Sequence, residues 1–180
     1  MPDPSPPSLP IGYGSRSATT ADVHAIHRLV AACEHELYGR APTSADRIAA
    51  DLGPSDPDLT CDAVLIHDSG GEPAGWGRVG GRRSTVDVHP AHHGRGLGRA
   101  LLSWAEGRAR RMGSDQLAQT AADRDHAAVA LLRSSGYSWL PSVSGQVPTD
   151  RGEAAGRRLS PRPDPPWSCS AEPRRPRCPA

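Results

Sequence analysis

The sequence contains no lysine, asparagine or phenylalanine, so all of its strongly basic side chains are arginines. Its 180 residues carry 21 basic and 20 acidic side chains, and a net charge of +1 gives no general attraction to nucleic acid or to a membrane surface. No apolar run is long enough to cross a bilayer, and the amino terminus lacks the charged and apolar regions of a secretion signal. We therefore expect a cytoplasmic protein with neither nucleic acid nor a membrane as its partner.

Cysteine is scarce as well. The four cysteines show none of the paired spacings of a metal site, and four are too few for a disulfide scaffold in a chain of this length. His89, His92 and His93 lie close together, but neighbouring histidines on a loop without cysteine or carboxylate partners at helical spacing are typical of surface residues. The sequence therefore predicts no bound metal.

Proline divides the chain into three parts. Of 19 prolines, five lie in residues 1–10 and nine in residues 141–180, which leaves five for the 130 residues between. Because proline has no N–H to donate, residues 1–15 are expected to form an extended, solvated leader. Residues 141–180 hold too few apolar side chains to offset the loss of chain entropy on folding, so a disordered tail is expected. The folded domain is predicted to span residues 16–140.

Hydrophobic periodicity predicts the elements of this middle part. Apolar spacings of three and four indicate helices, and short alternating or β-branched runs between turns indicate strands. Thr20 is expected to cap the first helix, and Thr43 with Asp46 to form a capping box for the second. The last strand–helix–strand unit implies a parallel pair of strands with a right-handed crossover. The expected helices lie at about residues 20–38, 43–52, 97–112 and 125–135, and the expected strands at 61–67, 73–79, 84–88 and 116–120.

One segment, VDVHPAHHGRGLGRALL, joins a strand to a helix through a glycine-rich loop. Gly94, Gly96 and Gly98 leave one side of the loop without side chains, so main-chain N–H groups can close on a ligand. The first turn of the helix adds unpaired donors and the positive end of the helix dipole, and Arg95 and Arg99 add formal charge. This pattern predicts a site for a phosphate or a pyrophosphate.

Two common nucleotide motifs do not fit this loop. The dinucleotide fingerprint requires glycine or alanine at its sixth position, where this chain has Arg99 or Leu101 in the two available registers. The phosphate loop of nucleotide hydrolases requires a lysine, and the chain has none. Both kinds of site are excluded.

The segment resembles the acyl-CoA loop of the GCN5-related N-acetyltransferase (GNAT) superfamily. In that family a strand with Val-x-Pro is followed by Arg/Gln-x-x-Gly-x-Gly/Ala and by two leucines on the helix. Here the pattern reads VHP from Val88 and HGRGLG from His93, with two leucines after it. A second family signature, Asn-x-x-Ala-x-x-Leu-Tyr and then Gly-Phe, reads DHAAVALL from Asp125, followed by Gly136 and Tyr137. The spacing matches throughout residues 85–137.

The resemblance implies a mixed α/β GNAT fold, in which helices flank a twisted central sheet of mixed strand direction. It also implies acetyl-CoA as cosubstrate and a primary amine, in a small molecule or a peptide, that attacks the acetyl thioester directly. Much of the rate would come from holding the two reactants together. The residues that match the family's cofactor site are Val86, Val88, His93, Gly94, Arg95, Gly96, Leu97, Gly98, Arg99 and Asp125.

The resemblance also implies two catalytic functions on the strand before the loop. The strand would pair with the pantetheine arm, and the main-chain N–H of Val88 would polarise the thioester carbonyl. Asp87, His89 and His92 are candidates for the base that accepts the amine proton. Asp87 lies between Val86 and Val88 in a strand, so its side chain is expected on the opposite face from theirs.

The end of the matching region leaves other readings open. Leu132 stands where the family often has the tyrosine that protonates the leaving thiolate, so no general acid is assigned. The family continues with one or two antiparallel strands, whereas nothing after Pro148 has the pattern of a central strand, and a change of reading frame near Ser142 is one hypothesis for this. Alternatives are a catalytically impaired CoA-binding or interaction module of the same fold, and a degenerate half that needs a partner domain. Open strand edges would also favour a homodimer.

Overall fold

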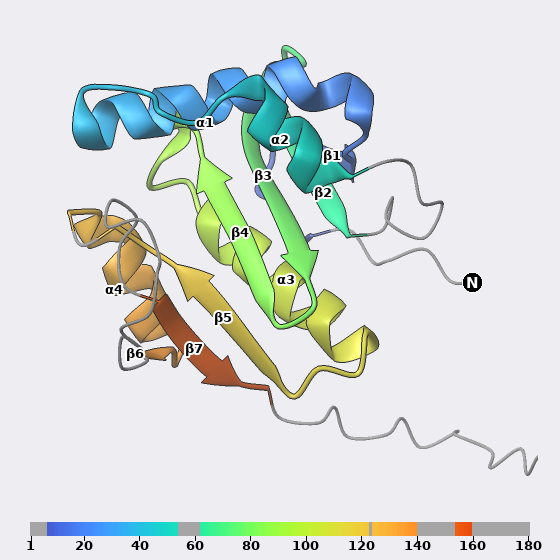
Figure 1. Ribbon diagram of the computed structural model, residues 1–180, viewed down its shortest axis with the longest axis vertical. Coiled ribbons are helices and arrows are strands. Elements are labelled where there is room, and N and C mark those ends of the chain that lie inside the picture. The colour runs from blue at the N-terminus through green and yellow to red at the C-terminus, as the bar shows by residue number, and fades with distance from the viewer. Residues whose placement is uncertain (1–6, 54–61, 123, 140–153, 160–180) are drawn as a thin grey trace, which may run out of the picture.

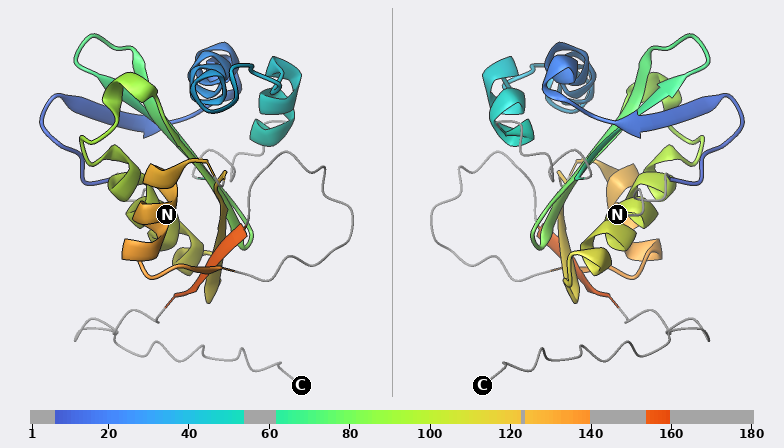
Figure 2. Two further views of the ribbon diagram at one scale, coloured as in Figure 1. Left: turned by 90° about the vertical axis from the view of Figure 1, so that its left-hand side faces the viewer. Right: turned by 90° about the vertical axis from the view of Figure 1, so that its right-hand side faces the viewer.

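The computed structural model describes residues 7–53, 62–122, 124–139 and 154–159. A seven-stranded sheet in the order β1-β2-β3-β4-β5-β7-β6 forms the centre of the molecule (Figure 1). Helices α1 and α2 cover one face of the sheet, and α3 and α4 cover the other (Figure 2). No helix in the described ranges is long and apolar enough to cross a membrane.

The elements follow one another in an order that agrees with a mixed α/β fold. Among the described strands, β4 and β5 pair in parallel, and every other neighbouring pair is antiparallel. The helices and strands are β1 (Tyr13–Ser17), α1 (Val23–Tyr38), α2 (Ala45–Leu52), β2 (Ala63–Asp68), β3 (Pro73–Gly80), β4 (Arg83–Val88), α3 (Leu97–Arg111), β5 (Gln116–Thr120), α4 (His126–Ser134), β6 (Ser138–Trp139) and β7 (Ala154–Arg158).

Most of the elements predicted for the middle of the chain are confirmed, some shifted by one to three residues at their ends. β5 has the predicted bounds, and the parallel β4–β5 pair joined through α3 is present as expected. α1 ends where Gly39 adopts the left-handed conformation, with φ of 68°. The prediction succeeds because these elements carry their own periodicity and stop signals.

Both predicted helix caps are wrong: Asp22 and not Thr20 is the N-cap of α1, and Ser44 and not Thr43 is the N-cap of α2. A short 3-10 turn (Thr20–Asp22) precedes α1, and the N–H of Thr19 donates to the Asp22 carboxylate at 2.8 Å. Ser44 caps α2 by accepting a hydrogen bond from the N–H of Arg47. Thr43 instead donates through its N–H and its hydroxyl to Glu34, so a tertiary contact replaces the expected capping box.

Asp22 joins β1 to the start of α1. Arg16 donates to both oxygens of the buried carboxylate, at 2.8 and 2.6 Å. These hydrogen bonds are the main reason why the pKa of Asp22 falls from its ordinary value of 3.8 to about 2. The resulting stabilisation is complete above the unfolded-state pKa and is lost as the pH falls through the folded-state pKa.

We expect Asp22→Asn to remove this part of the acid sensitivity. The wild type should lose about 1–2 kcal/mol more unfolding free energy than the variant between pH 5 and pH 2, allowing for the half-exposed side chain of Arg16. Urea unfolding at a series of pH values measures the difference. Parallel pH profiles for the two proteins would contradict the account.

Two strands extend beyond the range of residues 16–140 predicted to fold, β1 in part and β7 entirely. β1 begins at Tyr13, inside the expected leader, and Leu9 packs against the main core. β7, at residues 154–158, pairs antiparallel with both β5 and β6, so the expectation that no central strand follows Pro148 is wrong. The sheet is therefore more complete at this end than the sequence suggests. The predictions for residues 1–6, for 160–180 and for a change of frame near Ser142 lie outside the described residues.

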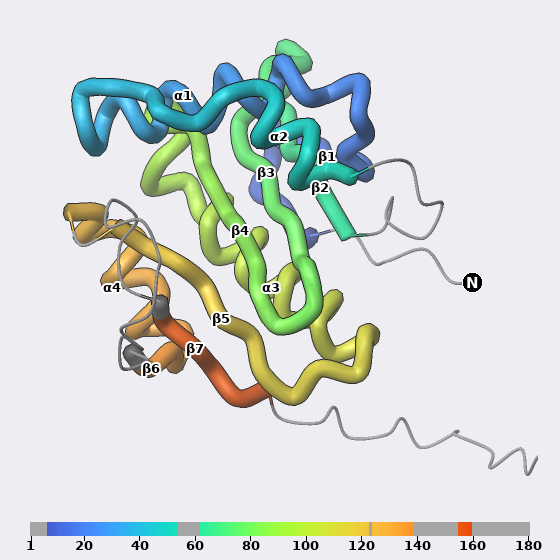
Figure 3. The backbone as a smooth tube through the Cα atoms, in the orientation of Figure 1, coloured from blue at the N-terminus to red at the C-terminus, as the bar shows by residue number. Residues whose placement is uncertain are grey.

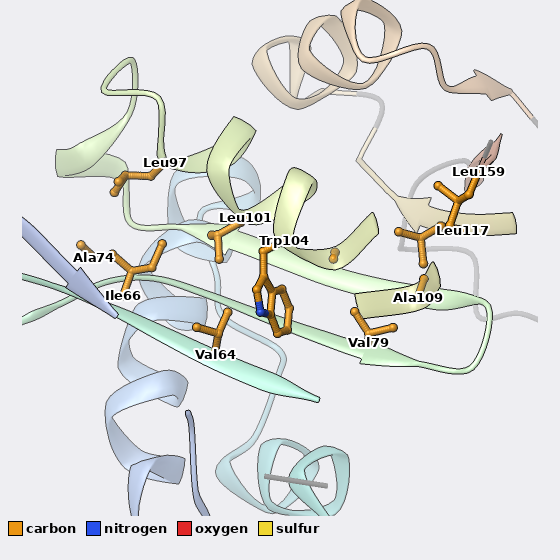
Figure 4. Packing of buried hydrophobic residues seen from close by; sticks show 11 residues of the cluster. Val64, Ile66, Ala74, Val79, Leu97, Leu101, Trp104, Ala109, Leu117 and Leu159 are labelled. Atoms are coloured by element: carbon orange, nitrogen blue, oxygen red, sulfur yellow. The ribbon is translucent and has the colours of Figure 1, made fainter. Parts of the chain in front are cut away.

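Two hydrophobic clusters cover the two faces of the sheet. Trp104, Leu101 and Leu97 of α3 point toward apolar side chains of β2 and β3 (Figure 4). On the other face Trp76 is 2% exposed and packs with residues of α1 and α2. Two buried tryptophans therefore supply large apolar side chains to the core of a chain without phenylalanine.

Candidate acyl-CoA site

Strands β4 and β5 run parallel and separate soon after they begin to pair. Their register joins Arg83 to Ala118 and Ser84 to Gln119, and the strands then diverge toward their carboxyl ends (Figure 3). β3 stays paired with β4 as far as Val88. Within the described part of the chain, the last residues of β4 therefore have no strand partner on their β5 side.

The glycine-rich loop follows directly at this end of β4. Gly94 and Gly96 have φ angles of 71° and 85°, which side-chain-bearing residues rarely adopt. Gly96 is the N-cap of α3, and its carbonyl accepts from the N–H of Ala100 at 3.1 Å. The N–H groups of residues 97–99 belong to the first turn of α3, where the helix itself provides no acceptor. The loop thus presents main-chain donors at the positive end of a 15-residue helix.

The other predicted loop residues lie around this helix start. The side chains of Arg95 and Arg99 are exposed, whereas that of Leu97 is 1% exposed and belongs to the core. Leu97 can therefore reach a ligand only through its main chain. At Gly98 an added Cβ would lie 2.9 Å from Cδ2 of Leu131, so this glycine allows α3 and α4 to approach closely.

Tyr13 of β1 contacts two residues of the loop through its hydroxyl. Its hydroxyl lies 2.9 Å from Nδ1 of His92 and accepts a hydrogen bond from Arg95 at 3.1 Å. Partial burial, and after it the charge of Arg95, lower the pKa of His92. Sequence reasoning missed Tyr13 because the contact joins residues about 80 positions apart.

The main chain of Val88 is where β4, α1 and the loop meet. The N–H of His89 donates to the carbonyl of Ala74 in β3 at 2.9 Å. Because the main-chain groups of successive residues point to opposite sides of a strand, the N–H and carbonyl of Val88 face away from β3. The Val88 carbonyl accepts from Sγ of Cys33 at 3.2 Å and from Nε2 of His93 at 2.9 Å. His93 therefore contacts β4, the strand that is expected from the family resemblance to bind the pantetheine arm.

Asp87 lies on the opposite face of β4, as its position in the strand predicts. Val86 and Val88 pack against the cluster around α3, whereas the Asp87 carboxylate accepts from Nε1 of Trp76 at 2.9 Å on the α1 side. His89 and His92, the other two candidate bases, lie beyond the strand end. Nδ1 of His89 accepts from the N–H of Ala91, and His92 is paired with Tyr13 as described.

The charges of four carboxylates act on the thiol of Cys33, a residue of α1. Burial, followed by the charges of these carboxylates, raises the pKa of the Cys33 thiol. The thiol is therefore protonated at neutral pH and acts as a hydrogen-bond donor to Val88. The carboxylates that contribute to this shift are Asp87, Glu36, Asp125 and Glu34.

Residues of the second signature have structural contacts. Asp125 caps α4 by accepting from the N–H of Ala128 at 2.8 Å. Leu132 is 2% exposed and places no hydroxyl near the loop. Tyr137 is 5% exposed and packs with Leu132, and burial, followed by the charge of Glu106, raises its pKa. Tyr137 is therefore a packing residue of this cluster.

Comparison with known proteins agrees with this geometry. The model of the acetyltransferase (GNAT) family matches residues 23–137, which is more than half of the chain. The chain belongs to the GNAT acetyltransferase family. This GNAT chain has the fold and the family membership that its sequence predicts.

Three relatives illustrate the similarity. L-methionine sulfoximine/L-methionine sulfone acetyltransferase of Salmonella typhimurium is 34% identical over 95 residues, which cover 47% of this GNAT chain and 53% of that protein. The crystal structure of a GCN5-related N-acetyltransferase from Sphaerobacter thermophilus is 28% identical with a TM-score of 0.66, over 74% of this chain and 45% of that one. This GNAT chain therefore spans about half the length of both relatives. A phosphinothricin acetyltransferase from Sinorhizobium meliloti, solved with acetyl-CoA, is 20% identical with a TM-score of 0.63, over 83% and 89% of the two chains.

Proposed function

We propose that the protein transfers an acetyl group from acetyl-CoA to a primary amine by direct attack. The observation that carries the proposal is the glycine-rich start of α3 beside the divergence of β4 and β5. In this account the N–H groups of residues 97–99 hold the diphosphate of CoA, aided by Arg95 and Arg99. The pantetheine arm lies along β4, and the N–H of Val88 polarises the thioester carbonyl.

The charges near Val88 favour an amine as the acceptor. Four carboxylates lie close enough to Cys33 to raise the pKa of its thiol, and a protonated amine would be attracted to the same region. Of the three candidate bases, Asp87 is on this face of β4 and is the one we infer to accept the amine proton. With Leu132 in place of a tyrosine, the leaving thiolate would take its proton from solvent or from the acceptor.

The relatives suggest which amines to test first. The curated Salmonella relative is named for L-methionine sulfoximine and L-methionine sulfone, and a solved relative for phosphinothricin. We infer that small amino-acid-like amines are the first acceptors to try, with peptide amino termini as the second class. The assay measures CoA release with each amine and acetyl-CoA binding by calorimetry. Binding without turnover on any amine would favour the alternative, a catalytically impaired CoA-binding module.

Direct attack predicts that Cys33→Ala keeps its activity. A double displacement needs a thiolate that carries the acetyl group, and burial and nearby carboxylates keep the Cys33 thiol protonated. We expect kcat to stay within about threefold of the wild type, because only a weak hydrogen bond to Val88 is lost. Mass spectrometry of the enzyme mixed with acetyl-CoA alone provides the second readout. Acetylated Cys33 that is then consumed by the amine would contradict direct attack.

The loop account predicts that Gly96→Val weakens cofactor binding. A β-branched residue at φ of 85° costs about 1–3 kcal/mol, so the loop would change shape rather than hold its donors in place. We expect the Kd for acetyl-CoA, measured by calorimetry, to rise at least about tenfold.

Gly81→Val is the matched control for this variant. Gly81 has φ of 60° in the β3–β4 turn, and an added Cβ there would meet no atom within 4 Å. The control should carry similar backbone strain and leave the Kd within about twofold of the wild type. Equal weakening by both variants would mean that the effect is a general loss of stability.

A further inference from the structure

The side chain of Gln119 lies at the point where β4 and β5 separate. Gln119 is 5% exposed, and Ser84, its register partner on β4, is 8% exposed. The amide orientation that satisfies both polar atoms places its nitrogen toward Ser84. In this orientation the nitrogen donates to Oγ of Ser84 at 2.5 Å and to its carbonyl at 2.6 Å, and the amide oxygen accepts from the N–H of Val86 at 3.2 Å.

These contacts reproduce the next rung of a parallel ladder. The N–H of Ala118 donates to the carbonyl of Arg82 at 2.7 Å. In a regular ladder the next residue of β5 to bond, Thr120, would donate to the Ser84 carbonyl and accept from the Val86 N–H. The main chain of β5 diverges from β4 before this rung, and a side-chain carboxamide takes the place of the missing main-chain groups.

We propose that Gln119 is a positioning residue that ends the β4–β5 ladder and fixes where cofactor pairing begins. Because Gln119 engages the N–H of Val86, the next main-chain donor on that edge of β4 is the N–H of Val88. The proposal rests on the proposed function, in which the Val88 N–H polarises the thioester carbonyl. Without the carboxamide of Gln119, the N–H of Val86 would be a second free donor on the same edge of β4 as the N–H of Val88. The thioester carbonyl could then bind at either donor and would no longer be held at one position.

Amide hydrogen exchange, followed residue by residue by NMR without cofactor, tests the structural half of the proposal. In the wild type the Val86 N–H should exchange at least about tenfold more slowly than that of Val88. Gln119→Met keeps the side-chain length and removes its polar atoms, so Val86 exchange should become about tenfold faster. Gln116→Met, the same change earlier on β5, is the matched control and should leave Val86 exchange unaltered. Equal exchange at Val86 and Val88 in the wild type would overturn the proposal even if Gln119→Met does not fold.

Kinetics test the functional half. We expect Gln119→Met to lower kcat about tenfold at saturating acetyl-CoA while the Kd for acetyl-CoA stays within about twofold. A weaker Kd with an unchanged kcat would overturn the positioning role. A wild type that turns over no amine would instead contradict the proposed function, and the exchange comparison would still decide whether Gln119 ends the ladder.

Discussion

Replacing Asp87 with asparagine is expected to lower kcat about a hundredfold and to leave the Kd for acetyl-CoA within about twofold. An amide cannot accept the proton that the attacking amine must lose. The amide oxygen of asparagine can still accept from Nε1 of Trp76, which is 2.9 Å from the native carboxylate, so the local geometry should persist. Steady-state kinetics at saturating acetyl-CoA, with calorimetry for the Kd, separate the two effects.

The control for this variant is Asp115→Asn. Asp115 is an exposed aspartate that pairs with Arg82 just before β5 begins, at the end of the strand away from the cofactor loop. The same chemical change there should leave kcat unaltered. The wild type should lose activity as the pH falls and the base is protonated, and Asp87→Asn should lack that acidic limb in its pH–rate profile. A variant with full kcat would remove Asp87 from the mechanism and leave His89 and His92 as candidates.

Glu106→Ala is expected to destabilise the fold by about 2–3 kcal/mol, since removing the buried carboxylate leaves its two arginine partners without their counter-charge. Glu106 of α3 is 8% exposed and accepts from Arg157 of β7 at 2.7 Å and from Arg110 at 3.3 Å. This ion pair joins the last described strand to the helix that begins at the cofactor loop. Chemical unfolding, followed by tryptophan fluorescence, measures the loss.

Two further variants define the origin of that loss. Asp51→Ala removes a partly exposed carboxylate that pairs with Arg47 and Arg78, and its cost should stay below about 1 kcal/mol. Arg157→Met keeps the aliphatic stem on β7 and removes the charge, so combining it with Glu106→Ala gives the coupling energy of the pair. A loss for Glu106→Ala no larger than that for Asp51→Ala would contradict the role of this ion pair in holding β7.

The fold is predictable where local sequence decides the structure. α1 and α3 carry periodic apolar residues and are followed by glycines, so their positions follow from the sequence. β7 has the sequence AAGRR, which shows no alternation of apolar and polar residues. It forms because β5 and β6 supply hydrogen-bond partners on both sides and Glu106 pairs with Arg157. Such contacts are made in three dimensions and leave no local signal.

The candidate site divides in the same way. The loop at Gly94 and Gly96 is predictable because a tight turn and a helix start depend on a few consecutive residues. Tyr13, which contacts Arg95, and Gln119, which completes the β4 edge, come from distant strands and acquire their roles only through the sheet. A polar residue on a short strand has many uses, and its spacing alone indicates none of them.

The measurement that tests the central claim most directly is a titration of the labelled protein with CoA and with pantetheine, followed by amide NMR shifts. Pantetheine lacks the diphosphate that the start of α3 is proposed to hold. CoA should bind at least about tenfold more tightly than pantetheine and should shift the amide signals of residues 94–99, which pantetheine leaves in place. Equal affinities, or CoA-induced shifts that leave residues 94–99 unchanged, would contradict the account.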